Sequence, residues 1–279
     1  MDIEKISTIF EKLTEKNDSF SKIPPSRKKI IQIIKDVHYL IFPEYFPLDD
    51  TIYEKKFLIE LLENLKEQIS IAFSFGGNSI TDAGAYAEQI ISELPQIKAK
   101  LIKDMQALYE GDPAAACKEE IILSYPGFYA ISIYRLAHEF YIRKIPLISR
   151  LMTEFAHEKT GIDIHAGATI GEYFFIDHGT GIVIGETTTI GDRVKLYQGV
   201  TLGAKSFELD ENGNPVKGIK RHPDIGNNVV IYANATILGG DTKIGDGAII
   251  GGNVWITESI EPDTVVYYGK AEHIKRKRI

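Results

Sequence analysis

Aliphatic residues recur at every sixth position through much of the second half of the chain. The series are Ile164, Ile170, Ile176 and Ile182; Ile184, Ile190, Leu196 and Leu202; Ile225, Ile231 and Ile237; and Ile244, Ile250 and Ile256. A period of six fits neither an α-helix nor an uninterrupted amphipathic strand, and regular short-period repetition is typical of a solenoid. We therefore predict a triangular parallel β-helix, in which each unit forms one short strand and three units close a coil of about 18 residues.

This six-residue period is interrupted at three places. One break adds two residues within the run Asp-His-Gly-Thr-Gly at 177–181, and a second inserts a charged loop at 204–223 that ends in Lys-Arg-His-Pro. The third adds a single residue near Gly-Gly-Asp at 239–241, which we interpret as a bulged corner. Loops that interrupt a regular scaffold often carry function, so we expect the functional site at the two breaks that contain histidine.

The first part of the chain has helical spacing instead. Apolar residues recur at intervals of three and four, and turn residues separate the segments. Helices are expected from Asp2 to about Val37 with a break at Pro24 and Pro25, over Tyr53–Phe73, over Ala83–Tyr109 with a kink or split at Pro95, over Tyr125–Tyr141 and over Leu147–His157.

The glycine distribution supports a division into two architectures, because only five of the 24 glycines lie in the first 160 residues. The predicted fold class is α + β, a helical bundle followed by a β-helix of about four or five coils. The predicted boundaries are an N-terminal α-helical domain at 1–158, a β-helix catalytic domain at 159–262 with the loop insertion at 204–223, and a C-terminal tail at 263–279.

Composition excludes several classes of protein. With 44% hydrophobic and 25% charged residues, the chain is expected to be soluble and globular. No apolar run reaches the roughly 18 residues of a spanning helix, and the N-terminus lacks a secretory signal, so we expect a cytoplasmic protein without a membrane partner. The net charge of -7 argues against nucleic acid as a partner. The lone Cys117 is expected to be a small buried hydrophobe.

Histidines and carboxylates at the breaks suggest acid–base chemistry. A histidine can take a proton from a hydroxyl when a carboxylate holds its ring in the right tautomer. His178 is the candidate base, and its partner is either the adjacent Asp177 or Asp163, which lies fifteen residues earlier and is expected to stack on the neighbouring coil. Arg221 offers a bidentate clamp for a carboxylate. Together these groups would hold an amino acid and deprotonate its side chain.

Each histidine also has a structural alternative, because isolated histidines usually make hydrogen bonds that support the fold. His38, His138 and His157 are interpreted in this way, and His165 either supports a catalytic neighbour or is structural. Three histidines on a β-helix also allow a zinc site of the γ-class carbonic anhydrase kind. Such a site needs two histidines about five residues apart on one coil. His165 and His178 are thirteen apart, and no metal site is predicted.

Four stretches of the β-helix region carry more specific motifs, at Thr160–Gly171, Phe175–Thr187, Leu196–Gly203 and Lys220–Pro223. With these motifs, the chain from about Asp112 to Tyr268 resembles the serine O-acetyltransferases, hexapeptide-repeat enzymes of cysteine biosynthesis. The Asp-His-Gly-Thr-Gly and Arg-His-Pro segments distinguish this family from other hexapeptide acyltransferases. The resemblance implies a left-handed parallel β-helix and transfer of acetyl from acetyl-CoA to the hydroxyl of L-serine, giving O-acetylserine.

The resemblance also implies roles for single residues. His178 would be the general base and Asp163 would orient its ring, with acyl transfer proceeding in one ternary complex. Backbone N–H groups near Gly203 and Ala204 would stabilise the oxyanion. The remaining implied contacts are Asp112 and Asp177 to the serine ammonium, Arg221 and His222 to its carboxylate, and Gly203, Ala204, Ala233 and Gly251 to CoA.

Further expectations concern partners. Acetyl-CoA would be a co-substrate rather than a tightly bound cofactor, and CoA would lie between subunits of a homotrimer or a dimer of trimers. Cysteine would inhibit by occupying the serine site. The tail ending in Ile279 would bind O-acetylserine sulfhydrylase or, alternatively, be a solvated run of charge, and the loop at 204–220 is either a lid or a solvated excursion.

Two alternative functions remain open at this point. One is acetyl transfer to the hydroxyl of a sugar or of another amino acid on the same fold. The other is a mainly regulatory role as a subunit of a cysteine synthase complex.

Overall fold

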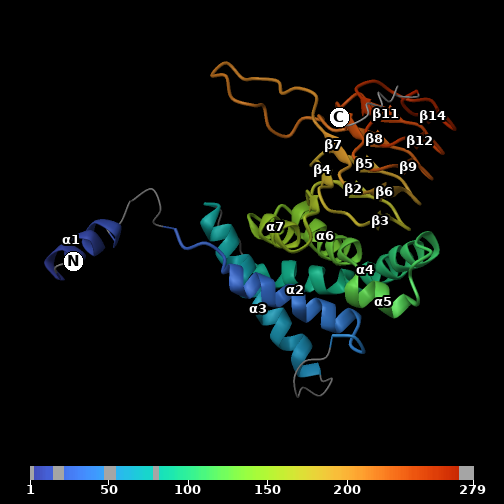
Figure 1. Cartoon of the computed structure of the whole chain (residues 1–279). Helices are drawn as coiled ribbons and strands as arrows, with labels where there is room; N and C mark the ends of the chain where they lie inside the picture. Colours follow the sequence, from blue (N-terminus) through green and yellow to red (C-terminus); the bar gives the residue numbers. More distant parts are fainter. Residues whose placement is uncertain (1–2, 15–21, 47–54, 78–81, 270–279) are drawn as a thin grey trace, which may run out of the picture.

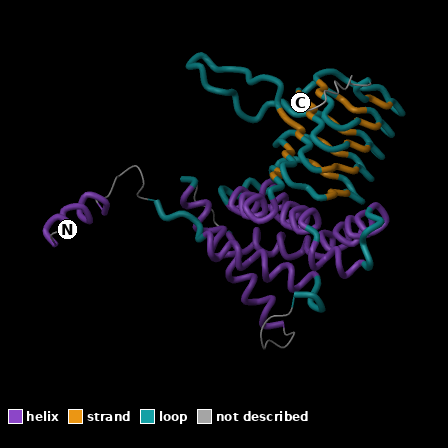
Figure 2. Tube along the Cα trace, viewed as in Figure 1, coloured by secondary structure: helices purple, strands orange, loops and turns teal. Residues whose placement is uncertain are grey.

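A computed structural model of the chain describes residues 3–14, 22–46, 55–77 and 82–269. In these residues a group of helices is followed by a stack of short strands, and the chain passes from one to the other near Gly161 (Figures 1 and 2). The described residues include no helix that is both long enough and apolar enough to cross a membrane. The predicted order of a helical part and then a β-helix is confirmed.

Seven helices make up the N-terminal part of the described chain. They are α1 (Ile3–Thr14), α2 (Arg27–Ile41), α3 (Lys55–Phe75), α4 (Ala83–Gly111), α5 (Lys118–Ser124), α6 (Pro126–Ile142) and α7 (Ile148–Thr160). Local sequence sets several ends: Ser26 and Asp82 cap α2 and α4 with their side chains, and Pro126 occupies the first turn of α6, where its missing N–H costs nothing.

Two details of the helical part differ from the sequence prediction. Helix α4 runs through Pro95 without a split, because Pro95 lies on the exposed side while Leu94 and Ile97 are buried and hold the helix against its neighbours. The short helix α5 was not predicted. Cys117 directly precedes α5 and is exposed, so the prediction of a buried cysteine was wrong.

The strands form three parallel sheets, which are the three faces of a β-helix. Sheet A has the order β1-β4-β7-β10-β13, sheet B β11-β8-β5-β2 and sheet C β14-β12-β9-β6-β3. The strands are β1 (Asp163–Ile164), β2 (Thr169–Ile170), β3 (Phe175–Asp177), β4 (Val183–Ile184), β5 (Thr189–Ile190), β6 (Lys195–Tyr197), β7 (Thr201–Gly203), β8 (Asp224–Ile225), β9 (Val230–Ile231), β10 (Thr236–Leu238), β11 (Lys243–Ile244), β12 (Ile249–Ile250), β13 (Trp255–Ile256) and β14 (Val265–Val266).

The aliphatic residues of the six-residue period fill the interior of the coils and are buried. The coil that joins Val183 to its partner Thr201 is 201 − 183 = 18 residues long, as predicted. The first coil, from Asp163 to Val183, is 183 − 163 = 20 residues long, because the break at 177–181 adds two. At the other end, β14 pairs with β12, so the coils extend beyond the predicted boundary at residue 262.

The helical part covers the open end of the β-helix, where the first coil has no preceding coil to pair with (Figure 1). Helix α6 satisfies carbonyl groups of that coil, since the hydroxyl of Tyr134 donates to the carbonyl of Ala168 at 2.6 Å and the Nδ1 of His138 lies 2.8 Å from the carbonyl of Ala166. Buried carbonyls without such partners would be costly. The first coil is therefore docked by specific hydrogen bonds as well as by apolar contact.

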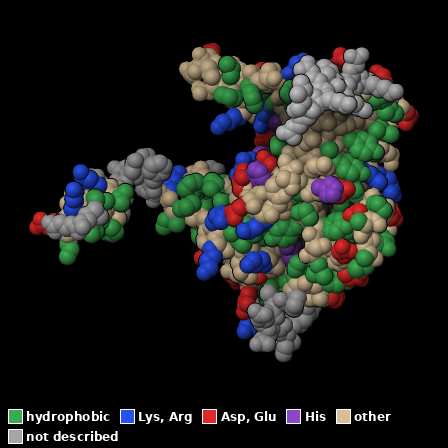
Figure 3. Space-filling model, in the orientation of Figure 1, with side chains coloured by type: hydrophobic (Ala, Val, Ile, Leu, Met, Phe, Trp, Pro, Cys, Tyr) green, Lys and Arg blue, Asp and Glu red, His purple; other side chains and the backbone are tan. Residues whose placement is uncertain are grey.

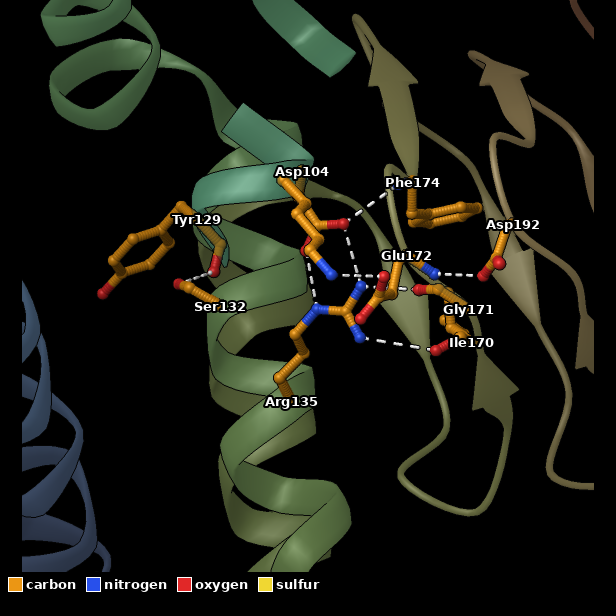
Figure 4. A network of polar contacts seen from close by, with 10 residues as sticks. Asp104, Tyr129, Ser132, Arg135, Ile170, Gly171, Glu172, Phe174 and Asp192 are labelled. Carbon is orange, nitrogen blue, oxygen red and sulfur yellow. Dashed lines mark hydrogen bonds and ion pairs between the residues drawn. The ribbon is translucent and has the colours of Figure 1, made fainter. Parts of the chain in front are cut away.

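A buried ion pair lies at the centre of this junction (Figure 4). The guanidinium of Arg135 on α6 donates to both carboxylate oxygens of Asp104 on α4, at 2.6 and 2.8 Å. The same guanidinium donates to the carbonyl of Gly171 at 2.7 Å, and Asp104 accepts from the N–H of Phe174 at 2.9 Å. The pair thus binds two helices to the loop that leads into β3.

Two glycines allow the helices to approach β3 closely. A Cβ on Gly111 would lie 2.5 Å from the ring of Phe175, and a Cβ on Gly127 would lie 2.5 Å from the carbonyl oxygen of Ile176. Neither position has room for a side chain. Strand β3 is therefore fixed by the end of α4 and the start of α6.

We expect Asp104→Ala to lower the free energy of unfolding by about 3 to 5 kcal/mol, because Arg135 would keep its charge in a buried place without a partner. Chemical denaturation measures the change. The control is Lys103→Ala: Lys103 pairs with Glu172 at 2.5 Å across the same junction, with side chains 37% and 36% exposed. Its loss should cost less than about 1 kcal/mol. Equal effects of the two variants would contradict the central role of the buried pair.

We expect Gly127→Ala to destabilise the protein by about 1 to 3 kcal/mol, since the added methyl group must displace the backbone of β3. Gly269→Ala is the matched control, because no atom lies within 4 Å of a Cβ at that position. Thermal unfolding of the two variants, compared with the parent chain, tests the close approach. An unchanged midpoint for Gly127→Ala would show that α6 and β3 are not in tight contact.

Candidate active site

The predicted site residues of the β-helix gather mainly at two of its edges. The C–A edge, between sheets C and A, consists of residues 178–182, 198–200, 232–235 and 251–254. The A–B edge consists of residues 165–168, 185–188, 204–223 and 239–242. The site therefore has to be described as two groups of side chains.

At the C–A edge, the first break of the period projects His178 from the coil. Its side chain is 71% exposed, and its Nδ1 lies 3.6 Å from Oδ1 of Asp177. The backbone of His178 has φ 56°, in the left-handed region that non-glycine residues seldom adopt. Conformations of this kind persist where the surrounding structure enforces them, often at functional sites.

Asp112 joins this group from the helical part, where it follows the last residue of α4. Its Oδ2 accepts from the hydroxyl of Tyr125 at 2.5 Å, and its Oδ1 accepts from the N–H of Ala114 at 2.8 Å. The pKa of Asp112 is lowered, first by the Tyr125 hydrogen bond and then by that of Ala114, and the charge of the nearby His178 adds to the effect. An anionic carboxylate therefore lies within electrostatic range of His178.

Asp163 lies on β1, where its register partner is Val183. His178 lies five residues before Val183, in the corner at the C–A edge, so Asp163 and His178 are not paired in the register of the strands. In the described part of the chain, no hydrogen bond or ion pair joins Asp163 to His178. The role of Asp163 in orienting His178 stays a prediction.

At the A–B edge, Arg221 is paired with the carboxylate of Glu186. The other oxygen of Glu186 accepts from the hydroxyl of Tyr141 on α6 at 2.7 Å, so the arginine is connected to the helical part. The ring of Tyr141 also packs edge-on against His165, at 5.6 Å between centroids. His165 accepts from the N–H of Gly167 at 3.0 Å, which is a structural contact within its own corner.

His222 has a defined tautomer at the same edge. Its Nδ1 accepts from the N–H of Thr187 at 3.1 Å, which leaves the ring proton on Nε2. Burial and then the charge of Arg221 lower the pKa of His222 to about 4, so the ring is neutral at pH 7. His222 can therefore donate a hydrogen bond to a substrate oxygen but brings no positive charge.

The four residues implied as CoA contacts divide between the edges. Gly203 ends β7 and Ala204 begins the long loop at the A–B edge, whereas Ala233 and Gly251 lie at the C–A edge. Next to Ala233, the rings of Tyr232 and Tyr197 are stacked at 5.2 Å with 15° between their planes. Tyr197 is in turn the register partner of Asp177. Aromatic surface thus continues along the coils from the acidic group at the C–A edge.

Sequence reasoning missed four residues that hold the predicted ones in place. Tyr125 binds Asp112, Glu186 and Tyr141 orient Arg221, and Thr187 contacts His222. Glu186 and Thr187 lie inside the recognised motif at Phe175–Thr187 and were within reach of the sequence. Tyr125 lies between α5 and α6 and Tyr141 lies on α6, both far from the motif in sequence, and no local signal indicated their contacts.

Histidine and acidic side chains also lie near one another on the molecular surface. Figure 3 shows histidine atoms beside acidic side chains where the helical part meets the β-helix. Among the described residues, no group of three or more histidine, cysteine, aspartate or glutamate side chains is arranged to hold a metal ion. The side chains described at the two edges include histidines, carboxylates and an arginine.

Comparison with known proteins gives the family of the chain. Residues 60–132 match the family model "Serine acetyltransferase, N-terminal". The plasmid-encoded serine acetyltransferase of Synechococcus elongatus is 43% identical in an alignment of 267 positions. The alignment covers 88% of this chain and 81% of that protein.

Solved structures of serine acetyltransferases are also similar to this chain. Serine acetyltransferase 1 of Entamoeba histolytica, in complex with L-cysteine, matches with a TM-score of 0.75 and 36% identity over 94% of this chain and 96% of that one. The serine acetyltransferase of Neisseria gonorrhoeae, in complex with serine, matches with a TM-score of 0.58 and 25% identity over 92% of this chain and 100% of that one. The relatives match both the helical part and the β-helix, and the chain belongs to the serine acetyltransferase family.

Proposed function

We propose that the protein transfers the acetyl group of acetyl-CoA to the hydroxyl of L-serine, giving O-acetylserine and CoA. Membership of the serine acetyltransferase family supports the reaction, and relatives that bind serine or cysteine support an amino acid as the acceptor. The observation in this chain that carries the proposal is the group at the C–A edge. There, Asp112 and Asp177 provide negative charge beside an exposed histidine, which suits an ammonium next to a reacting hydroxyl.

In the proposed mechanism, His178 takes the proton of the serine hydroxyl as the oxygen attacks the thioester carbonyl of acetyl-CoA. The tetrahedral intermediate then collapses and the C–S bond breaks. His178 gives its proton to the departing CoA sulfur. Asp112 and Asp177 hold the serine ammonium, and Asp163 is the carboxylate proposed to orient His178. Backbone N–H groups near Gly203 and Ala204 are proposed to stabilise the oxyanion.

The proposed carboxylate clamp lies at the other edge of the prism, with Arg221 and His222. Groups at different edges of a narrow prism face different directions, so one chain does not bring both ends of a serine molecule to one place. A homotrimer would solve this difficulty, because the C–A edge of one subunit can face the A–B edge of its neighbour around a threefold axis. The groove between them would also take acetyl-CoA along Ala233 and Gly251.

Other predicted properties stay predictions. Ile279 lies outside the described residues, so binding of the sulfhydrylase through the tail rests on the sequence alone, as does a cytoplasmic location. A dimer of two such trimers and inhibition by cysteine rest on the same resemblance. Most of the loop between residues 205 and 220 is exposed, and Asp210 stabilises it by accepting from the N–H groups of Asn212 and Asn214, each at 2.9 Å.

Thiol release from acetyl-CoA with a panel of hydroxyl acceptors tests the reaction. We expect L-serine to be the best acceptor, since it carries an ammonium for the acidic group and a carboxylate for Arg221, which the sugars do not carry together, and homoserine and D-serine test the length and the stereochemistry. Amino sugars, simple sugars, homoserine and D-serine form the rest of the panel. Release that requires a sugar, or that is absent with L-serine, would contradict the proposal.

We expect His178→Ala to lower kcat by on the order of 100-fold or more, because the hydroxyl proton would have no acceptor. Asp163→Asn should lower kcat by about tenfold or more if that carboxylate orients His178. His157→Ala is the control, since this exposed histidine contacts only Glu154 among the described residues. Steady-state kinetics at saturating substrates measures kcat for each variant. A near-normal kcat in His178→Ala would show that His178 is not the base.

A further inference from the structure

Tyr125 makes the shortest polar contact of the group at the C–A edge, although the mechanism above does not use it. Its hydroxyl donates to Oδ2 of Asp112 at 2.5 Å. With Oδ1 held by the N–H of Ala114, each carboxylate oxygen of Asp112 accepts one hydrogen bond from its own chain. The carboxylate plane is therefore fixed by two donors on different elements.

The backbones that carry these two side chains are fixed as well. The N–H of Asp112 closes the end of α4 on Leu108 at 3.0 Å, and the N–H of Tyr125 closes the end of α5 on Ile121 at 3.2 Å. Pro126 follows Tyr125 and restricts it to an extended conformation. The hydroxyl therefore approaches Asp112 from a rigid joint between two helices.

Both residues are also neighbours of the close contacts with β3. Gly111, which packs on Phe175, precedes Asp112, and Gly127, which packs on Ile176, lies two residues after Tyr125. Strand β3 ends with Asp177, and His178 follows directly. The hydrogen bond between Tyr125 and Asp112 thus joins the two places where the helical part holds the strand of the proposed base.

The chemistry of this contact suits an ammonium site. A tyrosine hydroxyl donates without adding charge, so Asp112 stays an anion, and each of its oxygens keeps a second lone pair for a further donor. A lysine or arginine in the place of Tyr125 would neutralise the carboxylate and compete with a substrate ammonium. Tyrosine fixes the direction of Asp112 and leaves its charge available.

We propose that Tyr125 is a positioning residue that holds the Asp112 carboxylate in the orientation in which it binds the amino group of the acceptor. This inference rests on the proposed function, in which the acceptor is serine. Tyr125 acts through Asp112 and does not touch the reacting atoms.

Removal of the hydroxyl alone tests the role. Tyr125→Phe keeps the ring in its place and should raise the KM for serine about five- to twentyfold, as expected for a hydrogen bond to a charged group. kcat and the KM for acetyl-CoA should stay within about twofold. The matched control is Tyr129→Phe, one turn along α6, because no hydrogen-bond partner of the Tyr129 hydroxyl lies among the described residues.

A double-mutant cycle separates positioning from a general structural effect. In an Asp112→Asn background, Tyr125→Phe should change the KM for serine less than twofold, since the hydroxyl no longer has its carboxylate to hold. An equal increase in both backgrounds, or an increase in the KM for acetyl-CoA of the same size, overturns the inference.

A titration independent of catalysis completes the test. Carbon-13 NMR of aspartate carboxyl groups, with the Asp112 signal assigned by its loss in Asp112→Asn, should show a higher pKa for Asp112 in Tyr125→Phe than in the parent chain. If the parent chain does not acetylate serine but this pKa shift is present, the proposed function fails. The hydrogen bond by which Tyr125 orients Asp112 is then still supported. If the parent chain is active and neither the titration nor the KM changes, the inference alone fails.

Discussion

A β-helix has an intrinsic problem at its first coil, which has a row of backbone groups and no neighbouring coil to pair with. Here the pair of Asp104 and Arg135 meets that constraint, because Arg135 donates to the carbonyls of Ile170 and Gly171 while Asp104 accepts from the N–H of Phe174. The ion pair neutralises its own charges and covers an open sheet edge at the same time. The proposed base His178 and its neighbour Asp177 lie on this same coil.

The helical part supports the coil that carries the proposed base. A β-helix alone would present Asp177 and His178 on a terminal coil with one unprotected side. The end of α4 and the start of α6 hold β3 through Gly111 and Gly127, and Asp112 enters the site from the same helix end. Support for the coil and the carboxylate of Asp112 therefore both come from the helical part.

The sequence was most informative where the period of side chains is strict. Inward-pointing aliphatic residues every six positions require a triangular coil, so the fold, the 18-residue step and the breaks could be predicted. The position of Asp163 relative to His178 could not, because His178 lies in the break at 177–181, where the chain leaves the regular path of the coil. The contacts of Tyr125 and Tyr141 also escaped prediction, since they join residues that only the packing of helices on the first coil brings together. Pro95 usually interrupts a helix, but α4 continues because its opposite face is buried. Cysteine is usually buried, but Cys117 is exposed at the turn before α5.

The exposed Cys117 has a practical consequence for work on this protein. It is the only cysteine of the chain, and it lies between Asp112 and Tyr125. A fluorophore or spin label attached to it would report on the segment between Asp112 and Tyr125, without competing attachment points. The same thiol will react with reagents that detect free CoA, so each chain contributes a fixed background that must be subtracted before turnover is counted.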